Sequence, residues 1–126
     1  MPRGESLYHK YPDYRVDLSD GAERVVATLA GEAIADSRRT LVVRETRHDP
    51  VVYFPREDVR FDLLTRTDHE TFCPFKGEAS YWTIPVGERE EANAVWSYED
   101  PFPEVAGLKD YVSFYADRVE LDFEAK

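Results

Sequence analysis

The chain has 126 residues, a mass of 14.6 kDa and 42% hydrophobic side chains, enough for one packed domain and too few for two. Its net charge of -10 repels phosphate backbones and anionic lipid, so we expect no nucleic-acid partner and no membrane partner. With one cysteine an internal disulfide is excluded, and we find no signal peptide and no apolar run of spanning length. We therefore expect a cytoplasmic protein.

Turn residues and β-branched runs divide most of the chain into short strands. Residues 1–13 lack periodicity, so we expect an N-terminal arm followed by a single domain over residues 14–124. Pro55 opens one expected helical turn, and Gly87 marks an expected hairpin tip. The expected strands cover residues 14–18, 24–30, 32–35, 40–46, 51–54, 60–64, 79–86, 92–98 and 118–123.

A different pattern begins at Pro103. Val105, Leu108, Val112 and Tyr115 recur at steps of three and four residues, which predicts an amphipathic helix. The predicted fold class is all-β, a mainly antiparallel sandwich or barrel with this one C-terminal helix against a side or an end.

The segment between residues 68 and 82 combines a thiol, an ammonium group, an imidazole and several aromatic rings. We interpret it as a functional loop between two strands. A tight turn would bring Cys73 close to Lys76, and His69 could act as the base for a nucleophilic thiol. Alternatively, Cys73 is a small buried apolar residue, and Lys76 forms a salt bridge with a carboxylate such as Glu45.

Cofactor and metal sites have little support in the sequence. No glycine-rich phosphate-binding motif is present, so we expect no nucleotide cofactor. The three histidines and the one cysteine are dispersed, and zinc sites need about four ligands, so we expect no metal. Arg38, Arg39 and Arg44 could bind a phosphate, but exposed ion pairs with carboxylates explain them better.

Aromatic residues occur as neighbours along three expected strands. Successive side chains of a strand point to opposite faces, so Tyr53 and Phe54 cannot both enter the same core, nor can Tyr81 and Trp82. Trp96 and Tyr98 add two more large rings. We expect one member of each pair to pack in the core and the other to line a ligand pocket or contact a second layer.

Several short motifs occur in a specific order. They are Asp36-Ser37-Arg38-Arg39, Val43-Arg44-Glu45, Val52-Tyr53-Phe54-Pro55-Arg56-Glu57-Asp58-Val59, Cys73-Pro74-Phe75-Lys76-Gly77-Glu78-Ala79-Ser80-Tyr81-Trp82 and Ala94-Val95-Trp96-Ser97-Tyr98. Together they resemble the bacterial domain of unknown function family 427 over about residues 14–123. The resemblance implies crossed antiparallel sheets, with a β-tent as one form, and motif residues gathered around one cleft. The CxxC pairs of zinc-bearing β-tent proteins are absent, which argues against a structural zinc.

The resemblance implies seven cleft residues, with aromatic rings as walls, Lys76 as a partner for an anion or a carbonyl, and Glu45 as its counter-charge or as a base. They are Glu45, Tyr53, Cys73, Lys76, Tyr81, Trp96 and Tyr98. Our leading hypothesis is a small-molecule-binding module, a monomer or weak homodimer, whose ligand is planar or weakly anionic. The alternatives are an enzyme with Cys73 or Lys76 as nucleophile, including the nucleotidyltransferase-like activity in the family's label, and a protein-interaction module.

Overall fold

The computed structural model describes residues 6–125, which form two antiparallel β-sheets and three short 3₁₀ helices. Over this range neither sheet closes into a barrel, and no helix has the length and apolar character needed to cross a bilayer. The elements in chain order are β1 (Val16–Asp20), β2 (Glu23–Leu29), β3 (Glu32–Ser37), β4 (Leu41–Glu45), β5 (Val51–Pro55), η1 (Arg56–Asp58), η2 (Phe61–Leu63), β6 (Thr65–Cys73), β7 (Gly77–Val86), β8 (Arg89–Ser97), η3 (Pro103–Leu108), β9 (Tyr111–Phe114) and β10 (Glu120–Ala125).

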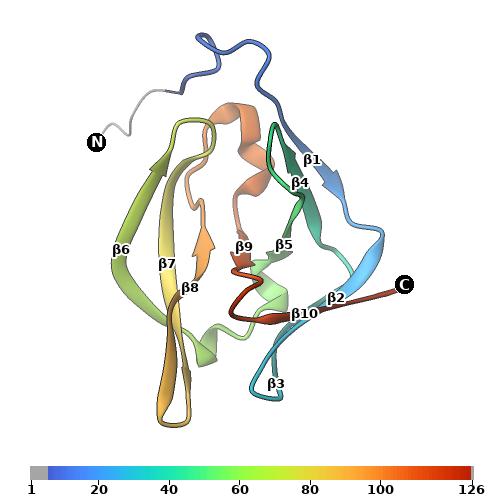
Figure 1. Ribbon diagram of the computed structural model, residues 1–126, viewed down its shortest axis with the longest axis vertical. Helices are drawn as coiled ribbons and strands as arrows, with labels where there is room; N and C mark the ends of the chain where they lie inside the picture. Colours follow the sequence, from blue (N-terminus) through green and yellow to red (C-terminus); the bar gives the residue numbers. More distant parts are fainter. Residues whose placement is uncertain (1–5, 126) are drawn as a thin grey trace.

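The larger sheet has seven strands in the order β1-β4-β5-β9-β8-β7-β6, and the smaller has three in the order β10-β2-β3. In Figure 1 the long strands β6, β7 and β8 stand on one side, and β1 and β4 stand opposite them. Strands β5 and β9 join these two halves, so the larger sheet is strongly curved. The expected mainly antiparallel all-β class is therefore confirmed.

Strands in the middle of the larger sheet are covered on both faces. On β7, Tyr81 belongs to one buried cluster and its neighbour Trp82 to the other; Tyr53 and Phe54 divide in the same way on β5. Trp96 on β8 lies opposite Tyr81 and packs against the same cluster as Tyr81. Strand alternation therefore directs one ring of each pair to the core beneath the smaller sheet and the other to the opposite side.

The first cluster lies between the two sheets. Its members come from β2 and β3 of the smaller sheet and from the central strands of the larger one, and Phe54 and Phe114 meet edge to face with ring centroids 5.3 Å apart. The second cluster covers the other face of the larger sheet, where Val105 and Leu108 of η3 belong to the same buried cluster as Tyr53. A curved sheet with two covered faces thus provides two separate buried regions.

The predicted C-terminal amphipathic helix is wrong. Residues 103–108 form the 3₁₀ helix η3, and Val105 inside it has non-helical backbone angles. Asp110 then adopts a positive φ of 66°, which ends the helical path. Strand β9 follows directly, and its Val112 lies opposite Phe54 of β5. Spacing by three residues suits a 3₁₀ turn as well as an α-helix, and tertiary strand pairing decides the conformation of the rest.

Two further expectations are corrected by the structure. Residues 60–64, expected as a strand, contain the short helix η2. The supposed loop over residues 68–82 consists of the end of strand β6, a three-residue turn and the start of strand β7. Most of β6 is exposed because it is the edge strand of the larger sheet, so its sequence lacks hydrophobic alternation. The helical turn after Pro55 and the hairpin tip at Gly87, where φ is 59°, form as expected.

Phe54 provides a test of the core between the sheets. Its side chain is fully buried, so Phe54→Ala should lower the free energy of unfolding by about 3–5 kcal/mol. Phe123→Ala is the control, because that ring is half-exposed, and it should change stability by less than about 1 kcal/mol. Urea unfolding measures both, and equal effects of the two variants would contradict the proposed packing.

Candidate functional site

A cavity of about 410 Å³ lies at the end of the larger sheet where the β6–β7 turn faces the β4–β5 hairpin. All seven residues predicted from the sequence line it. They are Glu45 at the end of β4, Tyr53 on β5, Cys73 at the end of β6, Lys76 in the following turn, Tyr81 on β7, Trp96 on β8 and Tyr98 just after β8.

The turn between β6 and β7 places Lys76. Its backbone N–H donates to the carbonyl of Cys73 at 3.2 Å, so the turn is as tight as the sequence predicts. Gly77 follows with a φ of 118°, a conformation that L side chains rarely adopt, and strand β7 starts there. This geometry brings the Lys76 side chain to the end of β4.

The polar end of the cavity is a buried ion pair. Lys76 Nζ contacts Glu45 Oε1, and the two side chains are only 12% and 9% exposed. Tyr14 donates its hydroxyl proton to Glu45 Oε2, and His48 Nε2 lies 3.9 Å from the same oxygen. Of the alternatives open in the sequence, Lys76 thus has Glu45 as its counter-charge.

The neighbours of Glu45 lower the pKa of its carboxyl group. Burial alone raises the pKa of a carboxyl, but the hydrogen bonds from Lys76 and Tyr14, with the charge of Lys76, oppose burial and lower it below its ordinary 4.5. Burial and the same hydrogen bond raise the pKa of Tyr14 above that of a free tyrosine. The carboxylate is therefore held ionised and the phenol protonated at neutral pH.

Aromatic rings form the walls of the cavity. Trp96 donates its indole N–H to the Tyr53 hydroxyl at 3.1 Å, with the two rings edge to face, and Tyr115 lies against Trp96 with centroids 4.5 Å apart. Lys76 Nζ sits 5.8 Å from the centre of the Tyr98 ring, within range of a cation–π interaction. The walls are consequently rigid, apolar surfaces with polar atoms at their edges.

The segment before β1 packs over the β6–β7 turn. Leu7 N–H donates to the carbonyl of Pro74 at 3.0 Å, Tyr8 donates its hydroxyl to the carbonyl of Phe75 at 2.5 Å, and the Tyr14 ring stacks on Phe75 at 3.7 Å. In Figure 1 this part of the chain passes over the end of the molecule that carries the turn. Residues 6–13, expected as an arm, thus help to shape the rim; residues 1–5 of that arm lie outside the described part.

Sequence reasoning missed six of the residues that line the cavity. Phe75 lies inside a motif already singled out, between Pro74 and Lys76, and that position could have identified it. No sequence signal shows that Tyr14 reaches Glu45, because the two are 31 residues apart in the chain. The missed residues are Tyr14, His48, Val51, Pro74, Phe75 and Tyr115.

His69, the histidine expected to activate Cys73, lies too far along the strand to reach its thiol. His69 and Cys73 both belong to β6, and four residues of extended strand separate their Cα atoms by about 13 Å. The His69 ring instead packs edge to face on Tyr81 and lines a different cavity. The hypothesis that His69 activates Cys73 is therefore wrong.

Within residues 6–125 no three His, Cys, Asp or Glu side chains converge as metal ligands.

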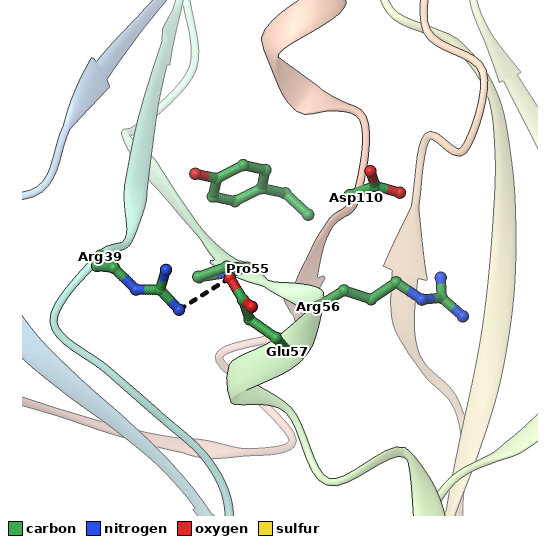
Figure 2. Close-up of a pocket in the computed structure, with 6 residues that line it drawn as sticks. Arg39, Pro55, Arg56, Glu57 and Asp110 are labelled. Carbon is green, nitrogen blue, oxygen red and sulfur yellow. Dashed lines mark ion pairs between the residues drawn. The ribbon is translucent and has the colours of Figure 1, made fainter.

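A second cavity, beside η1, is of a different kind (Figure 2). Arg39 Nη2 contacts Glu57 Oε1 at 2.9 Å there, and both side chains are more than half exposed. Arg56 leads away from that pair in Figure 2 and contacts Glu99 at 3.4 Å. Because its arginines already have carboxylate partners in open solvent, this cavity is a weaker candidate for ligand binding.

The buried ion pair predicts a pH-dependent loss of stability. Glu45→Gln leaves the Lys76 ammonium without its counter-charge and should cost about 3 kcal/mol near pH 7. Because the folded-state pKa of Glu45 is lowered, its contribution is present above pH 4.5 and disappears as the pH falls through that lowered pKa. Unfolding curves of wild type and variant should therefore converge below pH 4.5.

The matched control is Glu124→Gln, which removes an exposed ion pair with Arg24 at 3.2 Å. That variant should lose little stability near pH 7, because exposed ion pairs contribute little. If Glu45→Gln were no more destabilising than Glu124→Gln, the ion pair would not be the structural link described above.

Among curated proteins, none matches this chain. Residues 17–125 match the family described as domain of unknown function 427 (DUF427), which carries the label NTP_transf_9. The match covers the strands that build the cavity, as well as the smaller sheet. Because it spans most of the chain, this protein belongs to the DUF427 family.

Proposed function

We propose that this protein is a small-molecule-binding module, and that its ligand is a planar molecule held in the cavity between β4, β5, β7 and β8. The supporting observation is the combination in one cavity of aromatic walls with a buried Glu45–Lys76 ion pair. Ligand sites in proteins are mostly apolar concave surfaces with a few precisely placed polar groups, which is the composition seen here.

The size of the cavity supports the same proposal. A volume of about 410 Å³ falls in the range of roughly 300–1,000 Å³ typical of small-molecule sites. The flat faces of Trp96 and Tyr115, together with the nearby Tyr98 ring, suit a flat ring better than a branched aliphatic group. A ligand of one or two rings would fit this space.

The two alternative functions have less support. An enzyme with Cys73 as nucleophile would need a base bonded to the thiol, and among residues 6–125 no hydrogen bond joins a base to it. His48, which lines the same cavity, lies near Glu45, and Lys76, the other candidate nucleophile, is paired with Glu45. A protein-interaction module would need several exposed aromatic rings at this site, whereas Tyr53, Tyr81 and Tyr98 are each less than 9% exposed. Tyr115, at 38%, is the more exposed ring in the same cavity. Binding of a small molecule requires neither.

The two tryptophans provide a direct test. Trp96 lines the cavity and Trp82 lies in the core on the opposite face, and each gives one indole N–H signal. On titration of the ¹⁵N-labelled protein with a library of planar one-ring and two-ring fragments, at least one fragment should shift the Trp96 signal in a saturable manner. The Trp82 signal serves as the internal control and should stay nearly unchanged.

Two outcomes would contradict the proposed function. Either no fragment of the library shifts the Trp96 signal, or every active fragment shifts Trp82 and Trp96 equally, which would indicate nonspecific association or unfolding. Release of a copurified molecule on denaturation, detected by mass spectrometry, would provide independent support if the same molecule then shifts Trp96 when added back.

A further inference from the structure

We propose that the cavity recognises a neutral carbonyl oxygen on its planar ligand, and that the hydroxyl groups of Tyr53 and Tyr98 donate hydrogen bonds to it. This inference rests on the proposed function and adds the chemical class of the ligand. It depends on the hydrogen-bond donors that the folded chain leaves without acceptors at this site.

Tyr98 provides the first of these donors. Its side chain is only 8% exposed, and among the described residues its hydroxyl makes no hydrogen bond. Every fully enclosed side-chain nitrogen or oxygen in this part of the chain does have a partner. The Tyr98 hydroxyl must therefore face accessible space, and the space that Tyr98 lines is the cavity. A hydroxyl that opens onto the cavity and has no acceptor among the described residues is available to donate to a ligand there.

Tyr53 provides the second donor. Its oxygen accepts the indole N–H of Trp96, and this bond fixes the orientation of the phenol. A hydroxyl that accepts one bond still has a proton to donate, and no acceptor for that proton exists among residues 6–125. Trp96 thus orients Tyr53 as a donor without using its proton.

The remaining polar groups increase the surplus of donors. An ammonium group has three N–H donors, and Lys76 uses one of them on Glu45. Both oxygens of Glu45 already accept hydrogen bonds, one from Lys76 and one from Tyr14. The cavity therefore offers donors at its polar end, and a complementary ligand must bring an acceptor.

The charge of the site favours a neutral acceptor over a carboxylate. Glu45 and Lys76 neutralise each other, and the protein as a whole carries a net charge of -10. An anionic ligand would add an unmatched negative charge close to Glu45, where low exposure limits screening by water. A carbonyl oxygen accepts the same hydrogen bonds without that repulsion.

Both phenols stay protonated at neutral pH. Burial raises the pKa of Tyr98 and of Tyr53 above the ordinary value of tyrosine, and the interaction between the two groups raises the pKa of Tyr98 further. Each hydroxyl therefore keeps a proton that it can donate to an oxygen atom of a ligand in the cavity that both residues line.

Three one-ring probes separate the possibilities: acetophenone carries a neutral carbonyl, benzoate a carboxylate, and toluene no acceptor. The Trp96 indole signal of the ¹⁵N-labelled protein reports binding of each. Acetophenone should bind with a dissociation constant in the range of roughly millimolar, as expected for so small a ligand, and at least about fivefold more tightly than benzoate or toluene.

Variants identify the donors. Tyr98→Phe and Tyr53→Phe each remove one hydroxyl and keep the ring, and each should weaken acetophenone binding about five- to tenfold, as expected for one neutral hydrogen bond. Tyr98→Phe is the cleaner test, because Tyr53→Phe also removes the acceptor of the Trp96 indole N–H. Toluene binding should change by less than about twofold in both variants, since toluene accepts no hydrogen bond. The matched control is Tyr111→Phe, because Tyr111 does not line this cavity, and it should leave acetophenone binding unchanged.

The outcomes distinguish this inference from the proposed function. If benzoate or toluene binds as tightly as acetophenone, or if acetophenone binds equally to wild type and to both cavity variants, a planar-ligand site persists but the carbonyl assignment is wrong. If neither these probes nor the wider fragment library shifts Trp96, both proposals are wrong. Melting temperatures of the variants show whether a loss of binding comes from unfolding.

Discussion

Alternation of side chains along strands is the constraint on which the rest of this structure depends. Because β5, β7 and β8 are covered on both faces, each must carry large apolar groups at successive positions. Phe54 and Trp82 fill the core between the sheets, whereas Tyr53, Tyr81 and Trp96 face the other side. The inner rings pack in the core, and the outer ones line the cavity.

The ion pair between Glu45 and Lys76 links parts of the chain that strand pairing leaves separate. It connects the end of β4 to the β6–β7 turn, which belong to opposite ends of the seven-stranded sheet. Tyr14 extends the link to the segment before β1 by bonding Glu45 and stacking on Phe75. Two charges removed from water are tolerated only when each finds its partner, so this link holds the cavity in one geometry.

The polar groups of the cavity are held in place by contacts within the protein. Trp96 fixes Tyr53 by one hydrogen bond, and the Lys76 ammonium is placed between Glu45 and the Tyr98 ring. Polar groups fixed before binding lose little entropy when a ligand arrives, so a small ligand can be held by few contacts. In the proposed binding role, the surplus of donors over acceptors would give the site a chemical preference in addition to its shape.

Sequence alone determined the strand-rich class and the two-faced character of the aromatic pairs, because side-chain alternation is set by neighbouring positions. The resemblance of the ordered motifs to a family, and not alternation, supplied the seven residues that line the cavity. It wrongly indicated a helix through Val112, since three-residue spacing does not distinguish a 3₁₀ turn followed by a strand from an α-helix. Only the tertiary structure decided that Tyr14 meets Glu45, that His69 and Cys73 line different cavities, and that the Tyr98 hydroxyl is left without a partner among the described residues. These outcomes depend on curvature and pairing of strands distant in the chain, which no local pattern encodes.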